Sequence, residues 1–294
     1  MPPPNLDSTS VRGVFATLSK FGAYSYALDY LGFVAILIGY ISIVIFVEPF
    51  HRMFYINNIN LAFPHADVER VPVWLNIIYS ALIPLATVII YNAVTYASFH
   101  KHHNAILGLI IALTLSSLLT DIVKNAVGRP RPDLIARCKP MPGTQPDMLV
   151  TFDVCTETNH HTLHDGWRSF PSGHSSLSFS GLGYLALFFA GQLRIFRDKK
   201  GLGRALLCLS PLVGAILIAI SRCQDYRHDV YDVCVGAFLG FIVAIWSYRQ
   251  YWPQLSSQDC DEPCPAPGIE ADSEGWRRVR DEEEGGPIPG LNFG

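Results

Sequence analysis

The composition of this chain is that of a protein rich in apolar surface. It has 294 residues, of which 50% are hydrophobic and 16% charged, whereas a soluble domain usually carries about a quarter charged residues. The formal net charge is -3, but residues 253–294 hold ten Asp or Glu against three Arg, so the rest of the chain is net positive. No basic block suits nucleic acid, which excludes a nucleic-acid-binding function.

The apolar residues gather in long blocks that predict an all-α, polytopic membrane protein. A span of the hydrocarbon core needs roughly 20 apolar residues, and each block is far longer than a buried strand. After a polar leader over residues 1–25, we expect a six-span helical bundle over residues 26–250. The six predicted spans lie near residues 27–47, 74–97, 105–123, 175–193, 205–221 and 230–248. Pro84 and Pro211 fall inside two of them, and membrane helices tolerate such kinks.

The segments between the blocks predict the orientation in the membrane. Residues 194–204 form a short loop with five basic residues and one acidic residue, so the excess of positive charge on cytoplasmic loops places it in the cytosol. Counting spans outward puts both termini in the cytosol and the loops 48–73, 124–174 and 222–229 in the lumen or outside the cell. Residues 253–294 are rich in Pro, Gly and acidic side chains, which predicts a disordered tail.

The long polar loop also carries cysteines and histidines whose role the sequence leaves open. Cys138 and Cys155 form a disulfide if the loop faces an oxidising compartment, and otherwise remain separate thiols. His160, His161 and His164 could bind a metal ion, but exposed surface histidines are the simpler interpretation.

Three polar clusters interrupt the ends of the apolar blocks. They are KNAVGRPRP (124–132), FPSGHSS (170–176) and SRCQDYRHDVYD (221–232). Between His174 and Ser221 lie 46 residues, which is enough for two spans and a short turn, so the chain returns to the face it left. The first cluster ends the third predicted span, directly before the loop to the second. We therefore expect all three clusters on one face of the membrane.

The cations in these clusters predict a site for a phosphate group. Lys124, Arg131 and Arg222 would repel one another unless a multiply charged anion lies between them. The planar fork of arginine suits phosphate oxygens, and lysine adds a point charge. Ser172 can donate its hydroxyl, and Gly173 lets backbone approach the anion at the start of a helix, itself an anion site.

Two histidines and a carboxylate add chemistry that binding alone would not need. His228 and Asp232 are four residues apart at the start of the last predicted span, hence on one helical face. A carboxylate that holds one imidazole nitrogen leaves the other nucleophilic. His174 could then donate a proton to the leaving alkoxide. No paired-carboxylate or HExxH pattern is present, so the fixed cations are expected to act without a metal or other cofactor.

Together these residues resemble a known signature. Lys124-x6-Arg131-Pro132, Pro171-Ser172-Gly173-His174 and Ser221-Arg222-x5-His228-x3-Asp232 are similar, in residues and order, to the three motifs of the type 2 phosphatidic acid phosphatase superfamily. The resemblance covers roughly residues 25–250. It implies a helical core, a phosphohistidine intermediate at His228, His174 as general acid, and magnesium-independent activity.

The resemblance also implies a substrate class. The sequence before the second motif, Trp167 to Phe170, and the acidic tail are most similar to fungal diacylglycerol pyrophosphate phosphatases and lipid phosphate phosphatases. Their substrates are phosphatidate, lysophosphatidate and diacylglycerol pyrophosphate. Two alternatives remain: an isoprenoid pyrophosphate or sphingoid base phosphate as substrate, or a non-catalytic transporter or scaffold that binds phospholipid. The organelle and the oligomeric state are not predicted.

Overall fold

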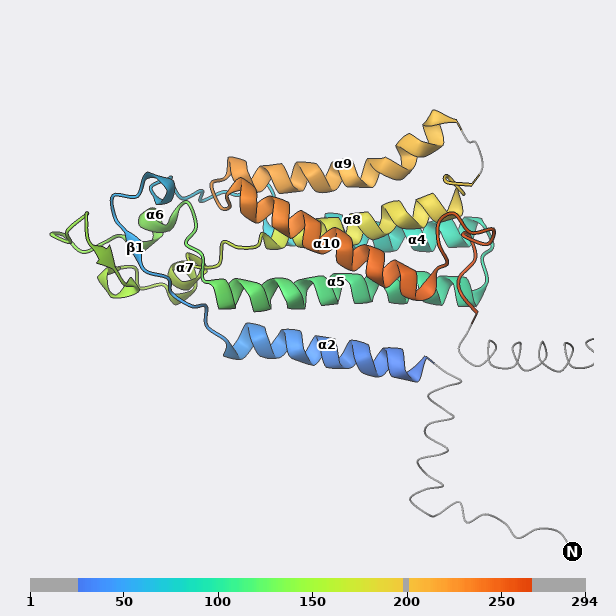
Figure 1. Cartoon of the computed structure of the whole chain (residues 1–294), viewed down its shortest axis with the longest axis horizontal. Coiled ribbons are helices and arrows are strands. Elements are labelled where there is room, and N and C mark those ends of the chain that lie inside the picture. Colours follow the sequence, from blue (N-terminus) through green and yellow to red (C-terminus); the bar gives the residue numbers. More distant parts are fainter. Residues whose placement is uncertain (1–25, 198–200, 266–294) are drawn as a thin grey trace, which may run out of the picture. The chain divides into compact units, whose positions relative to one another are not determined.

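The computed structural model describes residues 26–197 and 201–265, and residues 35–263 form one compact unit. In that unit long helices lie alongside one another, and α8 contacts α4, α5, α9 and α10 (Figure 1). The long helices and their partners are α2 (Ala27–Phe46), α3 (Val73–Ile77), η2 (Ile78–Leu82), α4 (Ile83–Val94), α5 (Phe99–Val127), α8 (Gly173–Gln192), α9 (Leu202–Gln224) and α10 (Val230–Tyr251). The predicted helical class is confirmed. The expected leader, residues 1–25, lies outside the described residues.

Five helical segments of the described residues are long and apolar enough to cross a membrane. They are α2, the continuous segment α3–η2–α4, α5, α9 and α10. The remaining predicted span, the fourth at residues 175–193, corresponds to α8, which has 20 residues but contains four serines and four glycines. These residues lower its hydropathy, and most of its side chains are buried against other helices. The count of six spans therefore stays a prediction.

Small residues let α8 approach its neighbours closely. A Cβ added to Gly181 would collide with the Ser80 carbonyl oxygen of η2, and one added to Gly240 of α10 would collide with the Ser176 carbonyl oxygen of α8. At the second contact, the Ser116 hydroxyl of α5 also donates to the Ser176 carbonyl oxygen at 3.2 Å. In lipid, such close packing and interhelical hydrogen bonds are the main forces between helices.

Pro84 explains the π-helical turn η2. A proline ring clashes with the carbonyl four residues earlier, here that of Ser80, and has no N–H to offer it. The helix widens over η2, a common response to such a conflict. The Ser80 carbonyl lies against Gly181 of α8. The kink expected at this proline is thus a widened turn that takes part in helix packing.

The loops before α3 and between α5 and α8 fold together beyond the helix ends, and we call them the cap. A small antiparallel sheet pairs β1 (Phe54–Tyr55) with β2 (Leu149–Val150), so that Phe54 lies opposite Val150. The short helices of the cap are η1 (Ile59–Leu61), α6 (Leu134–Cys138), η3 (Phe152–Val154) and α7 (His160–Asp165). Trp167 is fully buried in its core. The sequence left open whether Cys138 and Cys155 are paired or remain separate thiols, and in the structure they form a disulfide.

At the opposite end, two boundaries differ from the sequence-based expectation. α5 begins at Phe99 because Ser98 caps it, accepting from the Lys101 N–H at 3.2 Å. Lys101 falls between the second and third predicted spans but belongs to α5, and its side chain pairs with Glu262 at 3.1 Å. Residues 253–263 make turns against the bundle, unlike the disordered tail expected from residue 253 onward. Residues 266–294 of that expected tail lie outside the described residues.

Candidate active site

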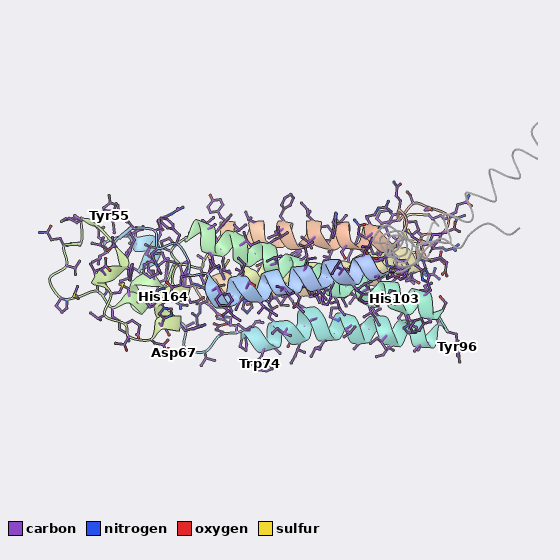
Figure 2. All side chains as sticks on the ribbon, turned by 90° about the horizontal axis from the view of Figure 1, so that it is seen from below. Tyr55, Asp67, Trp74, Tyr96, His103 and His164 are labelled. Atoms are coloured by element: carbon purple, nitrogen blue, oxygen red, sulfur yellow. A yellow bond between two sulfur atoms is a disulfide. The ribbon has the colours of Figure 1, made fainter. Side chains whose placement is uncertain are left out.

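All three polar clusters lie at the end of the helices that carries the cap. α5 and α9 end there, and α8 and α10 begin there. In Figure 2, Asp67 and His164 of the cap lie at this end, whereas Tyr96 and His103 lie at the other. The parity argument from the sequence therefore holds in the structure, and the clusters can build one site.

Lys124 is buried in the last turn of α5 and reaches the loop before α8. Its Nζ donates to the Pro171 carbonyl oxygen at 2.7 Å and to the Arg168 carbonyl oxygen at 3.2 Å. Gly173 passes beside it, since a Cβ added there would be 3.7 Å from the lysine Nζ. Lys124 thus fixes the backbone of the second cluster and places its Nζ next to the start of α8.

Arg131 is held by the cap. Its Nη2 pairs with Asp165 Oδ1 at 2.8 Å, and its Nε donates to the Asp165 carbonyl oxygen at the same distance. Arg137 pairs with the other carboxylate oxygen of Asp165 at 3.1 Å. Burial raises the pKa of the Asp165 carboxyl, but the two guanidinium groups outweigh it and lower that pKa well below its usual value. Asp165 is therefore ionised and fixes the direction of the Arg131 side chain.

Arg222, in the last turn of α9, is almost fully buried. Its Nη1 pairs with Glu69 Oε2 at 2.9 Å and donates to the Val71 carbonyl oxygen at 3.1 Å. Arg227 pairs with the other oxygen of Glu69 at 2.9 Å. Glu69 thus bridges two arginines and offsets part of their mutual repulsion. The loop before α3 supplies this carboxylate, which the motif spacing could not indicate.

The second cluster starts α8 and positions His174. Ser172 is the N-cap, and its hydroxyl accepts from the Ser175 N–H at 3.5 Å. The Ser172 N–H donates to the Asp232 carbonyl oxygen of α10 at 2.9 Å. His174 Nε2 lies 3.0 Å from the Val71 carbonyl oxygen. Because a carbonyl only accepts, this nitrogen carries the proton.

His228 and Asp232 lie close together but are not hydrogen-bonded. His228 Nδ1 is 3.8 Å from Asp232 Oδ2 and has no hydrogen-bond partner, and 3.8 Å is beyond hydrogen-bond range. The fully buried carboxylate has other partners: Arg129 Nη1 at 2.7 Å, the Ser169 hydroxyl at 2.5 Å and the Asp229 N–H at 3.0 Å. The sequence predicted direct contact between the imidazole and the carboxylate. In the structure the distance between them is too long for a hydrogen bond, because these three donors hold the carboxylate.

The environment of His228 keeps its ring neutral. The residue is 4% exposed and lies in the link between α9 and α10. Burial, together with the positive charges of Arg131, Lys124 and Arg222, holds the pKa of His228 well below its usual value. A neutral imidazole has a lone pair to offer, so the cations that would bind an anion also keep this nitrogen ready to react.

A cavity of about 740 Å³ brings most of the predicted residues together. Lys124, Arg131, Gly173, His174, Arg222 and His228 all line it. Ser172 and Asp232 do not line it. Ser172 caps the start of α8, and Asp232 lies beside the ring of His228. Apolar side chains from α2, α3, η2 and α8 line another part of the cavity, namely Tyr40, Val44, Val73, Ile77, Ala81 and Leu177. The cavity therefore joins a cationic end with two imidazoles to an apolar wall.

Several residues of the site were missed by the sequence reasoning. Asp165 and Glu69 hold the arginines, and Arg129 and Ser169 hold Asp232. Arg129 lies within the first motif, and its partners are Asp229, the N-cap of α10, and Asp232 in the first turn of α10. These roles depend on how the cap folds, and the sequence carries no local signal for that.

The chain resembles known proteins over most of its length. The family model described as the PAP2 superfamily matches residues 105–256. The chain is 41% identical over 235 residues to diacylglycerol pyrophosphate phosphatase 1 of Saccharomyces cerevisiae. The alignment covers 79% of this chain and 80% of the yeast protein. It is 34% identical over 255 residues to lipid phosphate phosphatase 2 of Arabidopsis thaliana. That alignment covers 86% of this chain and 85% of the Arabidopsis protein.

Proposed function

Because this chain belongs to the PAP2 superfamily, we propose that it is a lipid phosphate phosphatase whose nucleophile is His228. Its apolar helices make it an integral, multi-pass membrane protein. The proposed reaction is hydrolysis of the phosphomonoester or pyrophosphate of phosphatidate, lysophosphatidate or diacylglycerol pyrophosphate. The two relatives are named for diacylglycerol pyrophosphate and lipid phosphate as substrates, which supports this class.

The shape and lining of the large cavity carry the proposal. Lys124, Arg131 and Arg222 face the same space as both imidazoles, and the apolar wall adjoins them. A phosphate ester with an acyl chain has the same division, with charge at one end and hydrocarbon at the other. A soluble sugar phosphate would leave the apolar wall without a partner. The cavity therefore favours a lipid.

In the first step, His228 Nε2 attacks phosphorus while the bond from phosphorus to the ester oxygen breaks. The three cations neutralise the charge on the equatorial oxygens, as a magnesium ion does in other phosphoryl-transfer enzymes. His174, protonated beside the bound phosphate, gives its proton to the leaving alkoxide. The products of this step are the dephosphorylated lipid and a phosphohistidine.

In the second step, water attacks the phosphorus of the phosphohistidine. His174, now neutral, takes a proton from that water as the bond from nitrogen to phosphorus breaks. His228 returns to its starting form and inorganic phosphate leaves. Asp232, held by Arg129 and Ser169, lies next to Nδ1 and stabilises the positive charge that the ring gains.

The same assignment orients the protein. We place the cap and the active site in the lumen or outside the cell, with both termini in the cytosol. The Cys138–Cys155 disulfide of the cap supports this orientation, since structural disulfides persist in oxidising compartments. Arg194, Arg197 and Arg204, at the opposite ends of α8 and α9, support it as well.

The direct test is phosphate release from phosphatidate by the purified protein in detergent micelles, with EDTA present. We expect turnover that survives chelation and is abolished in His228→Ala, while this variant still binds the lipid. A wild-type protein inactive on all lipid phosphates would contradict the proposal. Adding diacylglycerol pyrophosphate, an isoprenoid pyrophosphate and a sphingoid base phosphate to the panel distinguishes the substrates, and lipid binding without turnover of any of them would indicate a transporter or scaffold.

A further inference from the structure

A second group of ligand-type side chains lies in the cap. Glu48 and His51 follow α2, and His160 and His164 lie on α7. We propose that these residues form a zinc site, in which Glu48, His160 and His164 bind the ion and His51 orients His164. The site would tie the segment after α2 to α7.

The geometry places the ligand atoms within reach of one ion. One ligand atom each from Glu48, His160 and His164 lies within 4.8 Å of the other two. His160 and His164 are four apart on one helical face, and their ring centroids are 3.8 Å apart. His160 Nε2 already lies 3.4 Å from Glu48 Oε1. Ligands of a tetrahedral zinc are about 3.4 Å apart, so a small rotation of exposed side chains completes the set.

His51 holds His164, one of the proposed ligands, in place before an ion binds. Its Nε2 is 2.7 Å from His164 Nδ1, which leaves His164 Nε2 as the ligand atom. The second nitrogen of a histidine that binds a metal is usually hydrogen-bonded to a carboxylate, a backbone carbonyl or water, which fixes the ring, and here His51 takes the place of that partner. The ring of His51 packs edge-on against the buried Trp167 with centroids 5.0 Å apart, and lies 4.7 Å from the Phe152 ring. Half of the site is therefore held in place before an ion arrives.

The ligand types select the metal. Two imidazoles and one carboxylate, with a water as fourth ligand, form a set that zinc accepts readily. Calcium and magnesium prefer sites built from oxygen. Glu48 and His160 are 67% and 70% exposed at their side chains, so an ion can enter from solvent.

The site is separate from the catalytic cavity. Glu48, His51, His160 and His164 are all absent from the lining of the cavity that holds His174 and His228. α7 nevertheless ends at Asp165, which holds Arg131. Zinc would therefore stiffen the helix behind the cationic end of the cavity without taking part in the reaction, and turnover is expected to survive its removal.

The test measures zinc binding and stability rather than activity. The untagged protein in detergent is stripped with EDTA, desalted and titrated with zinc, and its metal content and apparent Tm are recorded. We expect one zinc ion per chain and a rise in apparent Tm of about 5 °C or more when zinc exceeds its dissociation constant 100-fold. Glu48→Gln and His160→Ala remove exposed ligands, so folding without zinc should be unaffected while zinc affinity falls at least tenfold.

His102→Ala is the matched control, because His102 lies in the first turns of α5 at the other end of the helices. It should keep the wild-type zinc shift. The proposal is overturned if the wild-type protein binds no zinc, or if the Glu48 and His160 variants bind it as the wild type does. Loss of binding in His102→Ala alone would place the ion at the wrong end and would overturn it as well.

Discussion

Gly236 of α10 lies where helix packing and the active site meet, and Gly236→Ala is the most informative perturbation. A Cβ at this position would lie 2.5 Å from the Ser172 carbonyl oxygen, and 3.2 Å from both the Ser172 nitrogen and the Ser175 Cβ. Ordinary contacts are about 3.5 Å or longer. The loop that starts α8 must therefore retreat from α10 by roughly 0.5 to 1 Å.

That movement acts on the chemistry in a defined way. Ser172 caps α8, and its N–H donates to the Asp232 carbonyl oxygen, so the shift would displace Gly173 and His174 relative to α10. A misplacement of about 1 Å can cost a hundredfold in rate. We expect kcat/KM for phosphatidate to fall about 10- to 100-fold, which corresponds to about 1.4 to 2.7 kcal/mol.

Overpacking should also lower stability by about 1 to 3 kcal/mol, so the apparent Tm in detergent is measured beside the steady-state kinetics of the folded fraction. Gly214→Ala is the control, because a Cβ there would make an ordinary contact, 3.6 Å from Leu182 Cδ1. It should keep wild-type kinetics. Full activity in Gly236→Ala would refute the idea that contact between α10 and the α8 loop positions the site.

Three further predictions concern the groups behind the site. Arg129→Met should lower kcat about 10- to 100-fold with little change in KM, because Arg129 holds Asp232 from outside the catalytic cavity; a change confined to KM would contradict this. The lowered pKa of Asp165 means that its stabilising effect is present above about pH 4 and lost as pH falls further. Asp165→Asn should therefore be less stable than wild type at pH 7, and the difference in stability should shrink steadily as pH falls below about 4 in acid titrations of unfolding; parallel curves would oppose this. Replacing Cys138 and Cys155 by Ser, which opens a loop with a sequence separation of 17, should cost about 3 kcal/mol in unfolding experiments, and an unchanged Tm would count against the disulfide.

The parts of the site that the sequence predicted are those that depend on helix ends. The apolar blocks located the helices to within a few residues, apart from the early start of α5 at Phe99. Span parity then placed Lys124, His174 and His228 at one end, and all three line one cavity. These conclusions need only the length and polarity of segments, which the sequence states directly.

The parts that it did not predict depend on contacts between loops and on packing within the bundle. Glu69 pairs with Arg222, and Asp165 pairs with Arg131. Both pairs depend on how the cap folds, and no periodic pattern in the sequence predicts that fold. The four-residue spacing placed His228 near Asp232, but Arg129 and Ser169 draw the carboxylate away from the ring. Similarly, α8 reads as a span by length, whereas its serines and glycines serve close contact with other helices.

The most direct measurement follows the phosphoryl group itself. Phosphatidate labelled with ³²P at its phosphate is mixed with the enzyme, the reaction is quenched in alkali on the millisecond scale, and the labelled peptide is mapped. We predict an alkali-stable, acid-labile label on His228 in the wild type and none in His228→Ala. Label on any other residue, or hydrolysis by His228→Ala at the wild-type rate, would contradict the role of this imidazole and of the three cations gathered around it.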